Sequence, residues 1–226
     1  MGRVSGRTLS EAAYERLRSD IIAGRLPPEA KLRIEELRDI YDTGASPLRE
    51  ALNRLAGEGF VTAAGQRGFN VAPLSLAELD DITRLRILLE CEAASDAIRQ
   101  GDDAWEGNLV AAWHHLHKLD GRDAAALREW EVRNQAFHEA LIAACESTLL
   151  LRVRRTLYEQ HKRYRLISIL EHDAQRDVDA EHRAIFEAAL ARDVAAARRA
   201  IEVHVQRTAD ATRAAFARYA TAAGEA

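Results

Sequence analysis

The chain has 226 residues, of which 47% are hydrophobic and 30% are charged, and its formal net charge is −4. Abundant Ala, Leu, Arg and Glu, with only 6% aromatic residues, exclude a β-rich fold and favour helices in one large or two modest domains. No apolar run approaches the ~20 residues of a membrane span, and the N-terminus lacks a signal-peptide segment. We therefore expect a cytoplasmic protein with no membrane partner. Cys91 and Cys145 lack a CxxC spacing and are expected to be free thiols.

The first sixty residues predict three helices. Thr8 and Glu11 fit a capping box, and the apolar stripe that follows stops at Gly24, a residue suited to a helix C-terminus. A second, short helix is expected over about 34–41. A third follows a four-residue turn and runs to about residue 58. Two helices joined by so short a turn form a helix-turn-helix.

The third helix has the features of a recognition helix. Ser46 is expected as its N-cap, and Pro47 at the first helical position, where the missing N–H costs nothing. One face carries apolar residues at spacings of three and four, namely Leu48, Ala51, Leu52 and Leu55. Arg49 and Arg54 fall off this face, so they can contact a partner while the leucines face a core. The alternative is an ordinary surface helix with solvated arginines.

Two β-prone runs at 60–63 and 69–72 flank a glycine-bounded turn and predict a β-hairpin. Directly after a helix-turn-helix, such a hairpin is a wing, and its tip can reach a groove or a phosphate. The tip contains Gln66, Arg67 and Gly68. The alternative is a structural hairpin that closes a small core.

A domain boundary is expected near Pro73–Ser75, which gives a winged helix-turn-helix over 1–74 and a second domain over 75–226. The first segment carries 11 Lys or Arg against 10 Asp or Glu, so its net charge does not by itself indicate nucleic acid. The second domain shows no strand signal. It is expected to be an antiparallel bundle of six to seven helices, with segments at about 76–100, 103–119, 123–145, 148–171, 174–191 and 193–221.

Three histidines and one asparagine of the bundle are candidate metal ligands. Asn134 and His138 are four residues apart and share one helix face, while His182 and His204 lie beside apolar stripes on the last two helices. Imidazoles that converge from three helices suit a divalent metal such as Zn, with Ni or Mn as alternatives. Asn134 would add a carbonyl oxygen, and positions would remain open. The alternative is that these histidines hydrogen-bond one another or backbone carbonyls.

Two arginines of the bundle are candidate effector contacts. Arg86 and Arg165 lie within apolar stripes, where a guanidinium needs a carboxylate or an anionic ligand. A salt bridge, for Arg86 to Glu90, is the alternative.

These features together resemble the GntR family of bacterial transcription regulators, in its FCD branch, over about residues 10–212. In the first domain the matching runs are Ile22-Ala23-Gly24-Arg25-Leu26, Lys31-Leu32, Ser46-Pro47-Leu48-Arg49-Glu50-Ala51-Leu52, Arg54-Leu55, Glu58-Gly59-Phe60-Val61 and Gly65-Gln66-Arg67-Gly68-Phe69-Asn70-Val71. In the bundle they are Arg86 with Glu90, Asn134-Gln135-Ala136-Phe137-His138, Glu181-His182-Arg183-Ala184-Ile185 and His204. The chain departs from the family at Ala45, where an arginine is common, and at Asn134, where the family usually has Asp.

The resemblance implies a homodimeric repressor of a carboxylic-acid catabolic operon that binds a pseudo-palindromic operator. DNA would be contacted by Ser46, Pro47, Arg49, Arg54, Gln66, Arg67 and Gly68. A metal held by Asn134, His138, His182 and His204 would take a small carboxylate effector. Some runs look most like the family's glutarate-sensing members, which implies a dicarboxylate.

Two other classes of function stay open at this stage. A metal-dependent helical hydrolase would use the same imidazoles to activate water, although no glutamate is placed as in an HExxH motif. A helical interaction scaffold would use the histidines only as hydrogen-bonding groups of its core.

Overall fold

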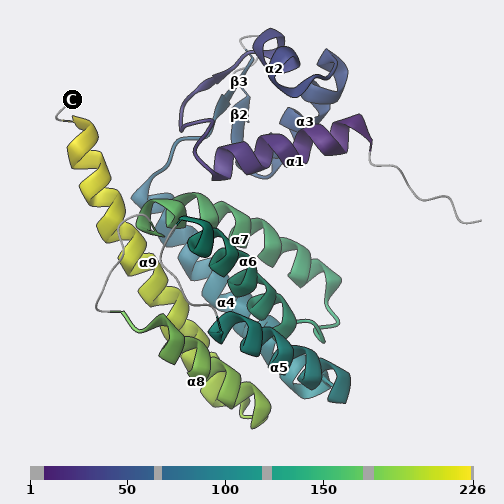
Figure 1. Ribbon diagram of the computed structural model, residues 1–226, viewed down its shortest axis with the longest axis vertical. Coiled ribbons are helices and arrows are strands. Elements are labelled where there is room, and N and C mark those ends of the chain that lie inside the picture. The colour runs from purple at the N-terminus through teal and green to yellow at the C-terminus, as the bar shows by residue number, and fades with distance from the viewer. Residues whose placement is uncertain (1–7, 64–67, 119–123, 170–175, 225–226) are drawn as a thin grey trace, which may run out of the picture. The chain divides into compact units, whose positions relative to one another are not determined.

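A computed structural model describes residues 8–63, 68–118, 124–169 and 176–224 (Figure 1). The chain divides into two compact units: Met1–Glu78 with Glu159–Leu166, and Leu79–Tyr158 with Ile167–Ala226. Each unit has its own hydrophobic core. The fold is mainly α, with a winged helix-turn-helix followed by a helical bundle, as the sequence predicted. Among the described helices, none has the length and apolar character needed to cross a membrane.

The first unit combines three helices with a small antiparallel sheet (Figure 1). The helices are α1 (Leu9–Ile22), α2 (Ile34–Tyr41) and α3 (Ala45–Gly57). The strands are β1 (Lys31–Leu32), β2 (Val61–Ala63) and β3 (Phe69–Val71), in the order β1-β3-β2. The expected hairpin is β2–β3. The sequence did not predict β1, because a two-residue strand has no periodicity and forms only by pairing with β3.

Local signals fix the ends of α1 as predicted. The Thr8 hydroxyl accepts a hydrogen bond from the Glu11 N–H at 3.2 Å, which satisfies one of the free donors of the first turn. Gly24 follows the C-cap with φ +71°, a conformation that favours glycine.

The start of α3 differs from the prediction. The helix begins at Ala45 and its N-cap is Gly44, which offers no side-chain cap, so Ser46 is not the N-cap. Pro47 is consequently the third helical residue rather than the first. Proline fits there because first-turn N–H groups have no carbonyl partner within the helix, and the first such bond runs from Leu48 N to Gly44 O.

Six described helices form the second unit, except that Leu76–Glu78 and Glu159–Leu166 are grouped with the first unit (Figure 1). They are α4 (Leu76–Gln100), α5 (Asp103–His117), α6 (Ala124–Leu141), α7 (Thr148–Ile169), α8 (Val178–Leu190) and α9 (Val194–Gly224). The hydroxyl of Ser75 caps α4 by accepting from Glu78 N at 3.1 Å. The side chains of Asp102 and Asp177 cap α5 and α8 in the same way.

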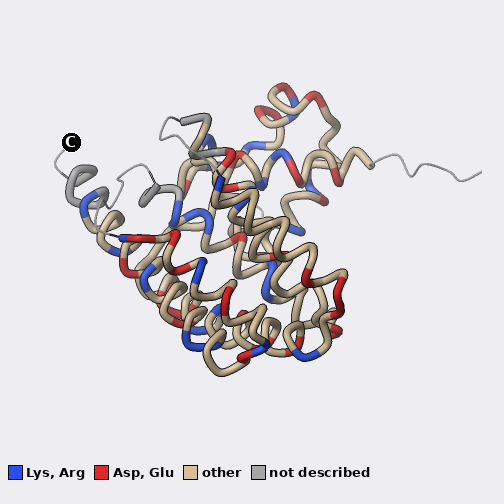
Figure 2. Tube along the Cα trace, turned by 60° about the horizontal axis from the view of Figure 1, so that its bottom comes forward, with Lys and Arg blue, Asp and Glu red and all other residues tan. Residues whose placement is uncertain are grey.

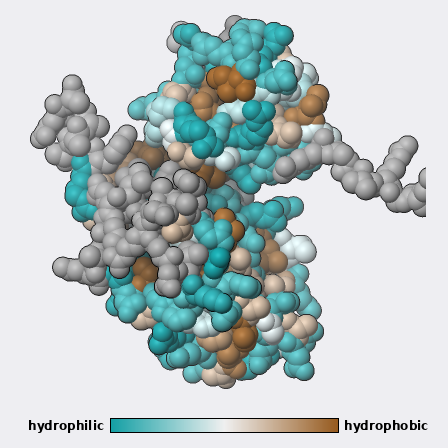
Figure 3. Space-filling model, in the orientation of Figure 1, coloured by the Kyte–Doolittle hydropathy of each residue, from teal (hydrophilic) through white to brown (hydrophobic). Residues whose placement is uncertain are grey.

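The core of the bundle is made of side chains from α4, α5, α6, α8 and α9, and it contains both free cysteines. Its most deeply buried large side chains include Ile98, Leu109, Phe137 and Ile185. Charged residues of both signs alternate along the helices (Figure 2), and the face drawn in Figure 3 is mostly hydrophilic with separate small apolar patches. This distribution leaves the buried polar residues as the features that call for an explanation.

Candidate DNA-binding surface and metal centre

Helix α3 has a buried apolar face and an exposed polar face, as a recognition helix requires. Leu48, Leu52 and Leu55 are fully buried in the core of the first unit. Arg49 and Ser46 are exposed, and within the described part of the chain neither makes a side-chain hydrogen bond or an ion pair. The leucines therefore fix the helix, and the Arg49 guanidinium remains available to a partner.

Arg54 is engaged within the protein, in contrast to Arg49. Its guanidinium lies 3.7 Å from the centroid of the Tyr14 ring, and its Nε lies 3.3 Å from a carboxylate oxygen of Glu58. The Tyr14 hydroxyl donates to Glu58 at 2.6 Å, and burial together with this hydrogen bond raises the pKa of Tyr14 to about 12. The cluster joins α1 to the end of α3. Sequence reasoning missed it because Tyr14 and Arg54 are distant in the chain.

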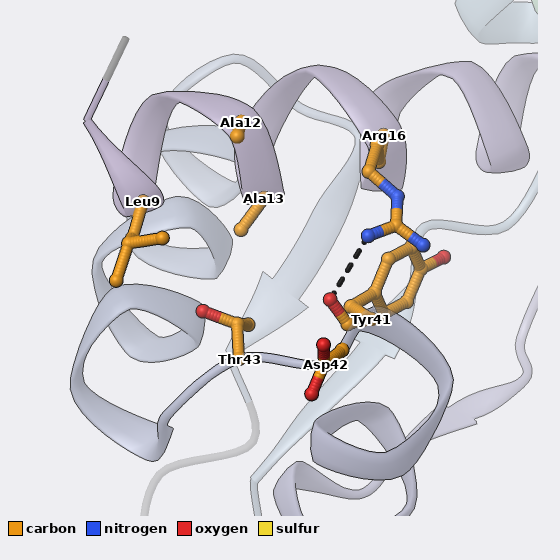
Figure 4. A pocket seen from close by; sticks show the side chains of 7 residues that line it. All are labelled: Leu9, Ala12, Ala13, Arg16, Tyr41, Asp42 and Thr43. Carbon is orange, nitrogen blue, oxygen red and sulfur yellow. Dashed lines mark hydrogen bonds between the residues drawn. The ribbon is translucent and has the colours of Figure 1, made fainter. Parts of the chain in front are cut away.

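Of the predicted wing tip, Gln66 and Arg67 lie outside the described residues. Gly68 precedes β3 with φ +100°, which residues with a Cβ rarely adopt. Beside the turn between α2 and α3 lies a cavity of about 210 Å³ (Figure 4). Its lining consists of Leu9, Ala12, Ala13, Arg16, Tyr41, Asp42 and Thr43.

Arg16 holds the end of α2 at this cavity. Its guanidinium donates to the carbonyl oxygens of Tyr41 and Ile40 at 2.9 and 3.3 Å (Figure 4 draws the first bond). A cation at the C-terminus of a helix satisfies free carbonyls and interacts favourably with the helix dipole. Arg16 therefore supports the turn that leads into α3, a role that no sequence signal indicated.

Three predicted metal ligands converge in the second unit. His138 of α6, His182 of α8 and His204 of α9 are all buried, and each offers a ring nitrogen within 4.8 Å of the others. Burial lowers the pKa of His138 well below its ordinary value, and the neighbouring His204, His182 and arginines lower it further. Burial likewise lowers the pKa of His204. Both shifts favour the neutral imidazole of His138 and His204, and neutral imidazole is the form that binds a metal.

Asn134 lies one turn before His138 on α6 and is fully buried. Among the described residues, neither its side-chain oxygen nor its nitrogen has a hydrogen-bond partner. A buried polar group left in this way costs about 1–3 kcal/mol, so its position calls for a partner. Three imidazole nitrogens and an amide oxygen form a donor set that fits a borderline divalent ion.

A carboxylate supports one of these histidines. Glu181 Oε2 lies 2.9 Å from His204 Nδ1, and Arg176 donates to both oxygens of Glu181 at 3.0 and 2.6 Å. Burial alone would raise the pKa of Glu181, but these hydrogen bonds outweigh it and lower the pKa to about 2. Glu181 was part of the sequence pattern, but no local pattern could indicate its contact with a residue of α9.

Arg86 has the carboxylate partner that the sequence offered as an alternative. It lies 3.1 Å from Glu90, whose other oxygen lies 3.0 Å from Arg154 of α7, a residue that the sequence did not single out. All three side chains are buried, and both guanidiniums lie near the Tyr158 ring, at 5.1 and 4.7 Å from its centroid. The carboxylate of Glu90 thus pairs with both arginines. Arg165, the other candidate effector contact, is also buried, but it belongs to the first compact unit, whereas Arg86 belongs to the second.

Two family descriptions match consecutive parts of the chain. Residues 9–71 match the bacterial regulatory proteins of the gntR family, and residues 81–207 match the FCD domain. The chain is a GntR-family regulator with an FCD domain. The second match contains all four proposed metal ligands, and the first contains α3.

Known proteins similar to this regulator are themselves transcription regulators. An uncharacterized HTH-type transcriptional regulator, BphR of Paraburkholderia xenovorans (strain LB400), is 40% identical over 204 residues, covering 88% of this chain and 83% of BphR. The HTH-type transcriptional repressor GlaR of Escherichia coli (strain K12) is 40% identical over 198 residues, covering 85% and 90%. The solved structure of E. coli McbR/YncC shares the fold, with a TM-score of 0.78 over 92% of this chain and 99% of that one, at 20% identity.

These relatives separate the classes of function that the sequence left open. BphR and GlaR are both described as HTH-type transcription regulators and not as enzymes, and the family that residues 9–71 match consists of regulatory proteins. The hydrolase alternative therefore has no support from the chain's relatives.

Proposed function

We propose that this regulator is a homodimeric repressor that a small carboxylate releases from its operator after binding at a metal centre in the helical domain. The observation that carries the proposal is the buried cluster of His138, His182 and His204, with ring nitrogens within 4.8 Å of one another. Three imidazoles in a core are costly to bury, and a shared ligand would explain why they converge.

On the DNA side, the proposal rests on Arg49, which is exposed and has no side-chain hydrogen bond or ion pair among the described residues, on a helix whose other face is buried. Arginine reads guanine in the major groove with two hydrogen bonds, or binds phosphate and sets the salt dependence of affinity. Ser46 and Pro47 begin the same exposed side of α3, and Gln66, Arg67 and Gly68 are proposed as the wing contacts. A two-fold dimer presents two such helices and requires a pseudo-palindromic operator with half-sites about one helical turn apart.

On the effector side, Asn134, His138, His182 and His204 would hold a divalent ion, with Zn preferred because its donors are mostly imidazole nitrogens. The ion would supply a positive centre for the effector's carboxylate. Arg86 and Arg154, which share Glu90, add positive charge close to His138 and would favour an anionic ligand. A dicarboxylate would place its second carboxylate toward such a positive region.

Release of DNA requires that the effector bind the non-DNA-binding arrangement of the dimer more tightly than the DNA-binding one. An effector that binds both arrangements equally tightly would not shift the equilibrium between them. A small carboxylate is thus a signal molecule in this proposal and is not chemically changed.

The proposal is tested by a thermal-shift screen of mono- and dicarboxylates on untagged protein, with and without a chelator. We expect at least one acid to raise the melting temperature, and the chelator or a His138→Ala substitution to abolish the rise. A rise that persists in both would exclude the metal centre as the effector site. A monomer in size-exclusion chromatography with light scattering would contradict the dimer.

A further inference from the structure

We propose that Glu181 is a positioning residue for the metal centre, which holds the His204 ring with Nδ1 protonated and Nε2 available to the ion. The inference rests on the proposed function, because it concerns a ligand of the proposed metal. Glu181 is not itself among the predicted ligands. Its side chain contacts the ligand His204 from the side opposite to the available nitrogen.

The hydrogen bond between the two residues determines which nitrogen is available. His204 Nδ1 and Glu181 Oε2 are 2.9 Å apart, and both side chains are buried. An ionised carboxylate can only accept hydrogen bonds, so the proton of the neutral imidazole must be on Nδ1. The lone pair of the ring is then on Nε2, which is the form required for metal binding.

Arg176 fixes Glu181 in this position. Besides its two hydrogen bonds to Glu181, Arg176 donates to the His204 carbonyl oxygen at 3.2 Å and to the Thr208 hydroxyl at 2.8 Å. The carboxylate is therefore anchored to the same turn of α9 that carries His204. Because the backbone carbonyl and the ring Nδ1 of His204 are both hydrogen-bonded, the ring loses little conformational freedom when a metal binds.

Neighbouring residues of α8 divide two tasks at this centre. Glu181 and His182 are consecutive in the helix, so their side chains point about 100° apart. The His182 ring lies 4.7 Å from the His204 ring, between centroids, while Glu181 contacts the Nδ1 of the same His204. Of these two residues, His182 supplies one metal ligand and Glu181 orients another, His204 of α9.

The electrostatic consequence follows from the donor set. Neither an amide nor an imidazole carries a negative charge, so a divalent ion held by Asn134 and the three histidines would have no negatively charged direct ligand. Glu181, which is itself paired with Arg176 and Arg207, accepts the Nδ1 proton of His204 and makes its Nε2 a better donor. Loss of such a supporting carboxylate typically weakens metal affinity by about 10–100-fold.

The test measures Zn²⁺ affinity of the full-length protein by competition with a chromophoric chelator. We expect Glu181→Ala to weaken binding about 10–100-fold and Glu181→Gln, which keeps an acceptor but not the charge, to weaken it less. The matched control is Asp179→Asn, two residues earlier in α8, because Asp179 is exposed and pairs with His117 at 2.7 Å. This control should bind Zn²⁺ like the wild type.

Two further measurements keep the result unambiguous. Glu181→Ala leaves Arg176 without its carboxylate, so the double variant with Arg176→Ala is measured as well, and circular dichroism checks that both variants fold. Nitrogen-15 NMR of the metal-free wild type should show His204 protonated at Nδ1. Wild-type Zn²⁺ affinity in folded Glu181→Ala, or a proton on Nε2, would overturn this inference alone. Absence of Zn²⁺ binding by the wild type would overturn the metal centre together with it.

Discussion

Replacement of Glu90 by Gln removes the one carboxylate that two buried arginines share. The side-chain exposures are 4% for Arg86, 3% for Arg154 and 5% for Glu90, so bulk water cannot take over its role. Loss of one partner from a buried ion pair costs about 3–5 kcal/mol, because the remaining charge stays buried and unpaired. For a chain of this size, that corresponds to a fall in melting temperature of roughly 6–20 °C.

Urea denaturation followed by circular dichroism measures this change, and the chain offers a matched control. Glu92 lies two residues further along α4 and pairs with Arg198 at 3.2 Å, but both side chains are exposed. Glu92→Gln should cost at most about 1 kcal/mol, as exposed pairs do. Equal and small effects of the two substitutions would show that the buried ion pairs of Glu90 stabilise the protein no more than the exposed pair of Glu92.

The pH dependence of the Glu90 effect has a definite sign. Burial raises the pKa of Glu90, but Arg154 and Arg86 outweigh burial and hold it below the ordinary value. A group with a lowered pKa in the folded state stabilises fully above its unfolded pKa, ~4.3 for Glu, and the stabilisation is lost as pH falls through the folded pKa. The difference in stability between wild type and Glu90→Gln should therefore be full at pH 7 and narrow below about pH 4.

Three other substitutions give further predictions. Arg49→Ala should weaken operator binding at least about tenfold in a mobility-shift assay. Each arginine–base contact is worth about 1–3 kcal/mol, and a dimer loses two of them. Unchanged affinity would exclude Arg49 as a contact. Asn134→Asp should tighten Zn²⁺ binding about tenfold in chelator competition and lower the melting temperature of the metal-free protein, because it buries a charge that only the ion neutralises. Weaker Zn²⁺ binding together with a higher melting temperature would exclude this position as a ligand. Arg16→Ala should lower the free energy of unfolding by about 1–2 kcal/mol through loss of two hydrogen bonds to α2, and a neutral effect would show that the turn holds without it.

Sequence patterns predicted those parts of the fold that depend on local signals. The Thr8 cap, the Gly24 stop and the leucine face of α3 could be read from residues within a few positions of one another. The error at Ser46 has a local cause as well. Pro47 is compatible with any of the first helical positions, so the pattern could not fix where α3 begins.

Features that depend on pairing between distant segments could not be predicted. The sequence placed three histidines on apolar stripes, but only the packing of α6, α8 and α9 brings their nitrogens within 4.8 Å. Periodicity likewise could not show that Arg54 lies against Tyr14 or that Arg154 shares Glu90 with Arg86. Each of these contacts joins side chains on different helices, and a helix period indicates a face without naming its partner.

The central claim is that a carboxylate at the metal centre controls DNA binding. Fluorescence anisotropy tests it most directly, with a labelled duplex selected for binding from a random pool and the effector found in the thermal-shift screen. The acid should release DNA from the metal-loaded wild type, whereas chelated protein and His138→Ala should not respond although both still bind the duplex. Release of DNA at the same acid concentration from all three proteins would contradict it.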